Sequence, residues 1–384
     1  MLTAAGCRTR RARLWDALDP RPDFVLISSP QCLVYLANYC PSPFVFRSVN
    51  SAAVLILGSD GSSLLVGDSM LKMFAPGCHV DEVALPTWYD GQHTAPPRGD
   101  LLVQNVLERL ASFPGSRIGY EASAVPAGIL EALRAARPDL KTVPVDSVLH
   151  RLKRQKDLDE LAVIRRSMAA GDAAHAAALQ DVRPGMSELQ VYELVAAAAC
   201  EAAGQQAWVY GDFVSGPRCD RERGGPPSDR IIEQGDLVLL DFSVVIHGYR
   251  GDFANTFACG GPPTDEQRRL YEACLQALSA GEQMIRPGMA CRDLDHAVRA
   301  SFAQQGLAES FLSHSGHGLG LGHPDPPYLV PSSSDTLLAG DIIAIEPGQY
   351  IAGVAGMRYE RNYLVTDSGY ETLSHLSLCI DQPG

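Results

Sequence analysis

Four acidic side chains in the second half of the chain stand at or near the ends of short apolar segments. They are Asp241, Asp252, Glu346 and Glu360. A carboxylate that ends an apolar strand points into the interior, where an ionised group is costly unless it is paired or bound to a metal. Divalent cations would offset four such charges, and carboxylate oxygens suit hard or borderline ions such as Mn²⁺ or Zn²⁺. The pattern therefore predicts a carboxylate-rich metal site.

Each pair of these carboxylates is expected on one antiparallel hairpin. Asp241 and Asp252 flank a turn near His247–Tyr249. Glu346 and Glu360 flank a second turn that contains glycine. Because antiparallel pairing brings cross-strand residues together on one face of a sheet, we expect the two members of each pair to lie opposite one another.

A glycine-rich segment supplies the imidazoles that such a site would use. Residues 313–323 read SHSGHGLGLGH, which places three histidines among four glycines. Glycine allows the backbone to approach a site closely. A single histidine is more often structural, but this context makes His317 and His323 candidate site residues.

An internal repeat divides this region into two related halves. Arg183–Met186 recurs 103 residues later as Arg286–Met289. Gly235–Asp241 recurs 105 residues later as Gly340–Glu346. Helical patterns surround the copies, at Leu158–Leu179, Glu188–Ala203 and Arg292–Gln305. Two matches in register at nearly equal displacement indicate duplication, so we expect two helix–helix–hairpin halves related by pseudo-twofold symmetry.

The first 150 residues alternate strand-like and helix-like patterns, which is typical of an α/β domain. Strands are predicted at Phe24–Ile27, Ala52–Leu57, Leu64–Val66 and Ile118–Tyr120. The charged stretch Arg151–Glu160 marks a boundary, which predicts one domain at residues 1–150 and a second at residues 151–384.

Composition and charge exclude several classes of protein. With 46% hydrophobic and 20% charged residues, the chain has the balance of a globular protein. A formal net charge of -13 disfavours nucleic acid as a partner, and the run Arg8–Arg13 is predicted to be a solvated helix face. The apolar runs are too short for a membrane span and the N-terminus lacks a secretion pattern, so we expect a cytoplasmic protein. Ten scattered cysteines predict buried thiols rather than disulfides or a zinc knuckle.

The candidate residues resemble the metal site of the pita-bread metallopeptidases, family M24. This family includes aminopeptidase P, prolidase and methionine aminopeptidase, with creatinase as a metal-free relative. The order and approximate spacing of the family's five metal ligands are matched by Asp241, Asp252, His317, Glu346 and Glu360. Similar flanking segments are GDLVLLD (235–241), GHGLG (316–320), IEPG (345–348), MRYERNYLVT (357–366) and KDLDEL (156–161). Arg11–Tyr39 resembles the start of the creatinase/prolidase N-terminal domain, so the resemblance covers nearly the whole chain.

The resemblance implies a fold and a metal content. The fold is a creatinase/prolidase-like α/β domain at residues 1–150 and an α+β pita-bread catalytic domain with pseudo-twofold duplication at residues 151–384. Two divalent ions are implied, Mn²⁺ first, with Zn²⁺, Co²⁺ or Fe²⁺ as alternatives, in a homodimeric protein. Asp241 would bind one ion, and His317 and Glu346 the other. Asp252 and Glu360 would bind both.

The same resemblance implies hydrolysis of a peptide bond, with a metal-bridging hydroxide attacking the carbonyl. Glu346 would carry the proton to the leaving nitrogen. His323 would donate a hydrogen bond to the substrate carbonyl, and Arg358 would orient a carboxylate beside the substrate. The resemblance therefore implies an Xaa-Pro peptidase of the aminopeptidase P or prolidase type that acts on short peptides.

Three positions depart from the family pattern. Gly224 stands where a histidine is usual, 17 residues before the first aspartate. His323 lies six rather than seven residues after His317, and Ala254 and Asn255 replace a common threonine and arginine. The missing imidazole leaves open an alternative, a hydrolase or lyase on the same fold that acts on a small non-peptide amide. A binding-only module or a metal-free reaction like that of creatinase is disfavoured, because all five ligand positions are retained.

Overall fold

The computed structural model describes residues 1–41, 53–111 and 115–382. The chain divides into two compact units, Met1–Lys153 and Arg154–Gly384. The predicted strand Ala52–Leu57 begins outside the described residues, since Ala52 is not among them, and the observed strand spans Val54–Gly58.

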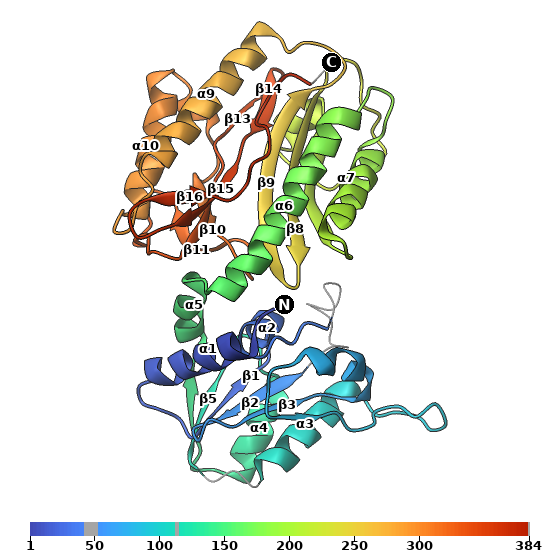
Figure 1. Cartoon of the computed structure of the whole chain (residues 1–384), viewed down its shortest axis with the longest axis vertical. Helices are drawn as coiled ribbons and strands as arrows, with labels where there is room; N and C mark the ends of the chain where they lie inside the picture. The colour runs from blue at the N-terminus through green and yellow to red at the C-terminus, as the bar shows by residue number, and fades with distance from the viewer. Residues whose placement is uncertain (42–52, 112–114, 383–384) are drawn as a thin grey trace. The chain divides into compact units, whose positions relative to one another are not determined.

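The N-terminal unit is built on one mixed sheet with strand order β4-β3-β2-β1-β5-β6 (Figure 1). Its elements are α1 (Ala4–Ala17), β1 (Phe24–Ile27), α2 (Pro30–Ala37), β2 (Val54–Gly58), β3 (Ser63–Val66), the 3-10 helix η3 (Ser69–Gly77), β4 (Glu82–Ala84), α3 (Arg98–Leu110), β5 (Arg117–Tyr120), α4 (Ala127–Ala136), β6 (Lys141–Pro144) and α5 (Asp146–Arg154). Phe24 and Leu26 alternate along β1 and share a core with Val106 of α3 and Ile129 of α4. This arrangement confirms the predicted α/β class.

Two of the arginines in the run Arg8–Arg13 are buried, so the prediction of a solvated helix face was wrong for them. Arg10 is fully buried, and its Nε donates to the carbonyl of Tyr35 at 2.7 Å. Arg11 donates through Nη1 to the carbonyl of Leu36, also at 2.7 Å. Tyr35 and Leu36 lie in the last turn of α2, where carbonyls lack partners within the helix. The guanidinium groups satisfy these carbonyls, which explains why the charges face inward.

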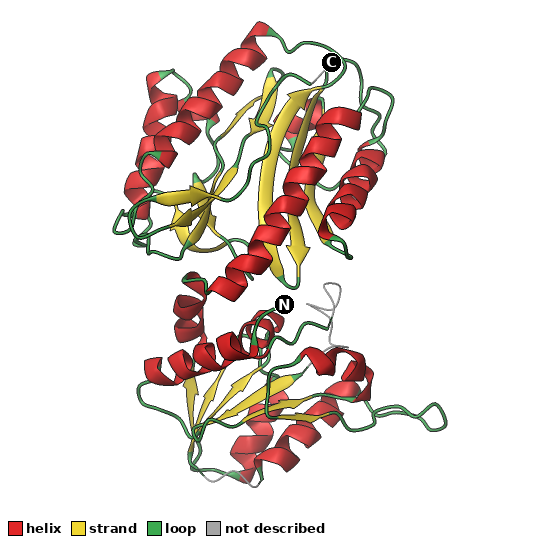
Figure 2. Ribbon diagram, viewed as in Figure 1, coloured by secondary structure: helices red, strands yellow, loops and turns green. Residues whose placement is uncertain are grey.

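The second unit places its strands between two pairs of helices, α6–α7 and α9–α10 (Figure 2). Its helices are α6 (Leu158–Asp181), α7 (Glu188–Ala203), α8 (Pro217–Arg221), α9 (Asp265–Glu282), α10 (Cys291–Gln304) and the 3-10 helix η4 (Ala308–Ser310). Its strands are β7 (Trp208–Ser215), β8 (Leu237–Ile246), β9 (Tyr249–Ala258), β10 (Gly316–Gly318), β11 (Asp325–Leu329), β12 (Ile342–Ile345), β13 (Gly348–Ile351), β14 (Ala355–Arg358), β15 (Arg361–Val365) and β16 (Tyr370–Thr372). The sheets have the orders β7-β8-β9, β11-β10-β12-β15-β16 and β13-β14.

The repeated motifs adopt the same backbone conformation, as expected for a duplication. Gly185 and Gly288 are left-handed, with φ of 94° and 83°. The N–H of Gly185 donates to the carbonyl of Ile232 at 2.8 Å, and that of Gly288 donates to Leu337 at 2.9 Å. The two acceptors are 105 residues apart, like the sequence repeat. The duplication predicted from the sequence is therefore present in the structure.

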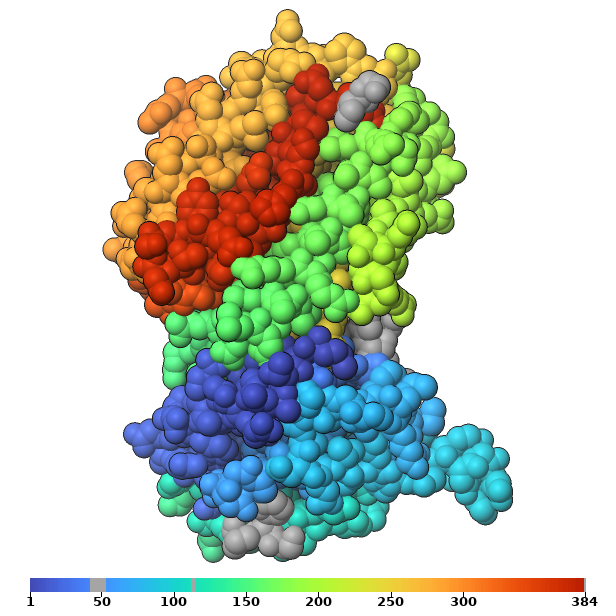
Figure 3. All heavy atoms as spheres, viewed as in Figure 1, coloured from blue at the N-terminus to red at the C-terminus, as the bar shows by residue number. Residues whose placement is uncertain are grey.

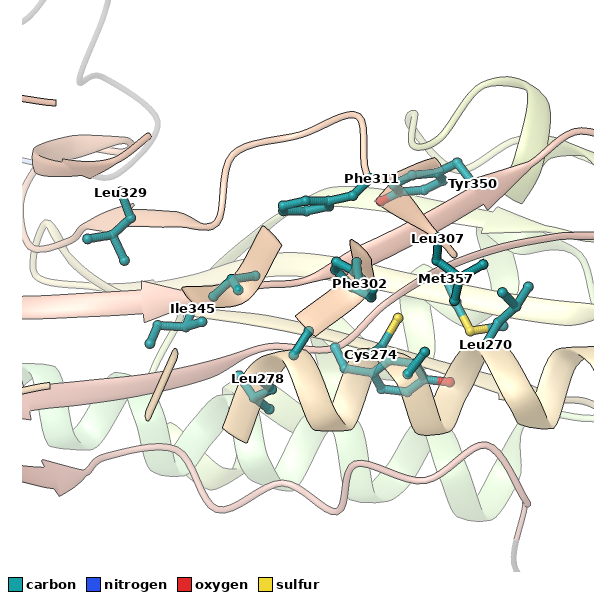
Figure 4. Close-up of a cluster of buried hydrophobic side chains, with 14 of the residues drawn as sticks. Leu270, Cys274, Leu278, Phe302, Leu307, Phe311, Leu329, Ile345, Tyr350 and Met357 are labelled. Atoms are coloured by element: carbon teal, nitrogen blue, oxygen red, sulfur yellow. The ribbon is translucent and has the colours of Figure 1, made fainter. Parts of the chain in front are cut away.

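The core of the second unit lies between α9, α10 and the strands of the second half (Figure 4). Phe302 of α10 is fully buried, and its ring centroid lies 5.0 Å from that of Phe311.

We expect Phe302→Ala to lower the free energy of unfolding by about 3–5 kcal/mol, because the substitution leaves a cavity that the fold cannot close. Urea denaturation measures this change. Val354→Ala, at a side chain with 43% exposure, is the control; an equal loss in both variants would contradict the assignment of this core.

The last described residues run along helix α6, where Figure 3 shows the red C-terminal segment against the green helix. The N–H of His375 donates to both carboxylate oxygens of Asp172 at 2.9 Å. Gln382 donates to the carbonyl of Leu179 at 3.0 Å. These bonds hold the end of the second half against the first helix of the first half.

Most of the cysteines are buried thiols, as composition predicted. All ten cysteines are free thiols; six are buried, while Cys40, Cys78, Cys200 and Cys379 are only partly buried. In the part of the chain that the structure describes, no helix combines the length and apolar character needed to cross a membrane.

Candidate active site and metal centre

The first two predicted ligands lie on the β8–β9 hairpin. The turn at His247–Gly248 pairs Ile246 with Tyr249, and the register that follows sets Asp241 opposite Ala254. Asp252 is set opposite Ser243. The expectation that the two aspartates lie directly opposite one another was therefore wrong: they are diagonal neighbours. They still share one face of the sheet, because residues two positions apart on a strand point the same way.

Glu346 and Glu360 lie on the corresponding hairpin of the second half. In β12–β15, Ile345 pairs with Arg361, and in β13–β14, Gly348 pairs with Arg358. Both registers, when continued, set Glu346 opposite Glu360, as predicted. The N–H of Glu360 donates to the carbonyl of Ala254 at 2.9 Å, which joins the two halves beside Asp241.

His317 reaches the site from β10, a strand paired on both sides. A β-carbon at Gly316 would collide with the carbonyl oxygen of Ala344, and one at Gly318 would collide with that of Pro326. Only glycine permits these approaches, as the sequence suggested. The Nδ1 of His317 lies 2.9 Å from the carbonyl oxygen of Gly318, and its Nε2 lies 3.1 Å from Oε1 of Glu346.

The five predicted ligands form overlapping groups of possible metal-binding atoms. In each group all ligand atoms lie within 4.8 Å of one another. The groups are Asp241–Asp252–Glu360, Asp252–His317–His323 and His314–His317–Glu346. A cavity of about 200 Å³ opens onto these groups. The predicted residues that line it are Asp241, Asp252, His317, His323, Glu346 and Arg358.

His323 and Arg358, predicted to face the substrate, both contact carboxylates that are predicted metal ligands. The Nε2 of His323 lies 2.6 Å from Oδ2 of Asp252. Arg358 forms an ion pair with Asp241 and a longer one with Glu346, at 3.8 Å. Both side chains also border the cavity, so each can contact a ligand carboxylate and a molecule in the cavity.

The carboxylates are more buried than isolated anions would tolerate. Asp252, Glu346 and Glu360 are buried, and the side chain of Asp241 keeps 14% exposure. Burial, together with the charges of Asp252 and Glu346, raises the pKa of Glu360 well above its ordinary value. The same causes raise the pKa of Asp241 to about 7, against the effect of Arg358.

This electrostatic situation fits a pair of divalent cations. Among the described residues, the buried Oε1 of Glu360 has no hydrogen-bond partner, although it lies beside Asp241 and Asp252. A buried acceptor of this kind needs a proton or a cation. The donors are carboxylate oxygens and imidazole nitrogens, which are ligands that Mn²⁺ and Zn²⁺ accept.

In the second half of the unit, hydrogen bonds rather than burial set the pKa values of Glu346 and His317. Burial alone would raise the pKa of Glu346, but hydrogen bonds to His314 and His317 hold it well below its ordinary value. Burial lowers the pKa of His317, yet its hydrogen bond to Glu346 and the nearby charges raise it to about 9. These contacts therefore keep the carboxylate of Glu346 ionised at neutral pH.

Two residues at the site were missed from the sequence. The Nε2 of His314 lies 3.0 Å from Oε1 of Glu346, and Asp212 lines the cavity from β7. His314 had a usable signal, since it belongs to the same glycine-rich segment as His317. Asp212 had none, because it is a single acid within an otherwise ordinary strand pattern. Burial raises the pKa of Asp212, with Arg358 acting against this.

Comparison with known proteins agrees with this geometry. Residues 162–367 match the model of metallopeptidase family M24, and residues 10–154 match that of the creatinase/prolidase N-terminal domain. An uncharacterized peptidase of Bacillus subtilis, YqhT, is 31% identical over 280 residues, which is 72% of this chain and 78% of that protein.

Solved structures have the same fold over nearly the whole length. The X-Pro aminopeptidase from Thermotoga maritima has a TM-score of 0.84 at 20% identity, covering 97% of this chain and 99% of the other. The dipeptidase PepE from Mycobacterium ulcerans has a TM-score of 0.79 at 26% identity, covering 99% of each chain. The match to the M24 family alone spans more than half of the chain. The N-terminal domain that precedes it has its own match. The chain thus belongs to metallopeptidase family M24.

Proposed function

We propose that this metallopeptidase is an Xaa-Pro peptidase of the aminopeptidase P or prolidase type, with two divalent ions at its active site. The observation that carries the proposal is the convergence of the five predicted ligands, from both duplicated halves, at one place. Four of them line one cavity, and Glu360 is grouped with Asp241 and Asp252 behind it. The similar structure from Thermotoga maritima, named an X-Pro aminopeptidase, supports the choice of substrate.

We assign Asp241 to one ion, and His317 and Glu346 to the other. Asp252 and Glu360 would bind both. Asp252 suits a shared role because it belongs to a group with Asp241 and to another with His317. When bound, the ions would polarise the scissile carbonyl and lower the pKa of water toward 7.

The protein's own side chains would handle protons and orientation. Glu346, ionised and bordering the cavity, would accept the proton of the attacking water and return it to the leaving nitrogen. His323 would donate a hydrogen bond to the oxygen on which negative charge develops. Arg358 would hold Asp241 in place through their ion pair.

We further propose Mn²⁺ as the metal, short peptides as substrates, and a cytoplasmic homodimer. Oxygen-rich donor sets suit Mn²⁺. A cavity of about 200 Å³ suits the end of a short peptide rather than a folded protein. Ten free cysteines fit a reducing compartment, and the homodimer follows from resemblance to the family.

Metal analysis combined with a substrate panel tests the proposal. Protein purified with Mn²⁺ should hold two ions per chain and cleave Ala-Pro or Ala-Pro-Ala, with Ala-Ala as the control dipeptide. Two bound ions without cleavage of either Xaa-Pro substrate would contradict it. That result would instead favour the alternative of a small non-peptide amide, which Gly224 in place of the usual histidine leaves open.

A further inference from the structure

Asp212 is a cavity-lining carboxylate that the proposed metal site does not use. It lies on β7 directly opposite Asp241, and it borders the same cavity. The N–H of Gly225 donates to its Oδ1 at 2.8 Å, which holds the carboxylate in place. Within the described residues, Arg358 forms its ion pairs with Asp241 and Glu346, and no arginine or lysine is paired with Asp212.

Gly224 makes the room that this carboxylate occupies. A β-carbon at position 224 would collide with Oδ2 of Asp212. A histidine, the usual residue of the family there, could therefore not coexist with Asp212 in its present position.

The position of Asp212 defines the kind of group that it can bind. Residues directly opposite on antiparallel strands have β-carbons about 5 Å apart. The distance in space between Asp212 and the predicted ligand Asp241 is therefore about the length of one amino-acid residue of a bound peptide. Two divalent ions would offset the four ligand carboxylates, whereas Asp212 belongs to none of the groups of possible metal-binding atoms. A partly buried carboxylate that borders a cavity is best satisfied by a cationic group that donates hydrogen bonds to it.

We propose that Asp212 is a substrate-binding residue that pairs with the α-ammonium group of the substrate's first residue. The inference rests on the proposed function and adds the recognition of the substrate's first residue. In a peptide cut after that residue, the α-nitrogen is two bonds from the scissile carbonyl carbon. Because Asp212 and Asp241 line the same cavity from opposite positions on paired strands, an ammonium group so close to the scissile carbon can reach Asp212.

Two substrates that differ only in the amino group test this role. Ala-Pro carries the ammonium group and propionyl-Pro lacks it. We expect the wild-type enzyme to prefer Ala-Pro in kcat/KM by about 10- to 100-fold, the range for a hydrogen bond between charged groups. Asp212→Asn should remove most of this preference by slowing Ala-Pro alone. Gly224→Ala should reduce it too, because the added carbon displaces the carboxylate.

Direct binding and metal content complete the test. Calorimetric titration with L-alanine and with propionate, the two acyl products, should show a preference for alanine in the wild type and none in Asp212→Asn. The exposed Asp367→Asn is the matched control and should retain the preference. All variants should keep two metal ions per chain.

Several outcomes would overturn the inference. Equal losses on both substrates in Asp212→Asn would indicate a structural role. Three ions in the wild type and two in Asp212→Asn would make the residue a metal ligand. If the wild type cleaves neither substrate, the proposed function fails, while the titrations still decide whether Asp212 selects an ammonium group.

Discussion

Asp252→Ala is expected to abolish peptide hydrolysis and to release metal from the site. Asp252 is the carboxylate that belongs to groups on both sides of the site, and it is buried. Its oxygens lie 3.1 Å from Oγ of Ser243 and 2.6 Å from Nε2 of His323. Replacing a supporting residue of a metal site costs roughly 10- to 100-fold in activity or affinity, and loss of a shared ligand should exceed that range.

The measurement compares kcat/KM for Ala-Pro and bound metal per chain in the variant and the wild type. Asp381→Ala is the matched control, because Asp381 is a surface aspartate with 56% exposure that pairs with Arg268. A thermal melt of both variants separates loss of the site from loss of the fold. Unchanged turnover in a folded Asp252→Ala protein would refute the assigned site.

Glu346→Gln should lower kcat by about 10²- to 10⁴-fold while KM changes little, the range expected when a general base is removed. The amide keeps an oxygen that can accept from His314 and His317, which contact Oε1 in the wild type. It cannot accept a proton from water at neutral pH. Because Glu346 is also an assigned metal ligand, the loss of kcat is read only from protein that still holds two ions per chain. The amide keeps a ligand oxygen that Glu346→Ala would remove.

Steady-state kinetics and metal analysis on the same preparations check this expectation. The control is Glu371→Gln, on a glutamate with 47% exposure that pairs with Arg165 at the surface. A variant that retains two ions but keeps wild-type kcat would show that Glu346 is not the proton carrier. Another group bordering the cavity, such as His314 or His323, would then have to serve.

Much of the second unit could be predicted from the sequence because its signals are local. The helix at Glu188–Ala203 was predicted with its exact bounds, since Ser187 and Gln190 form a capping box at its start. The glycines of the repeated motifs adopt left-handed conformations that few other residues tolerate, so their recurrence carried structural meaning.

Other features depended on contacts between segments far apart in the chain. The burial of Arg10 required the carbonyls at the end of α2, which lie 25 residues along the sequence. The diagonal relation of Asp241 and Asp252 was set by where the hairpin turn falls, and a shift of two residues leaves the sequence pattern unchanged.

The sequence by itself determined the duplication, the class of both units and the five candidate ligands. These features depend on strand ends, glycine positions and residue spacing, which are local properties of the sequence. Tertiary structure alone decided how the ligands group, that Arg358 pairs with Asp241, and that Asp212 enters the cavity. The space beside Gly224 is the clearest case. Whether a glycine leaves room for a particular carboxylate depends on the packing of two segments in three dimensions, and no one-dimensional pattern records it.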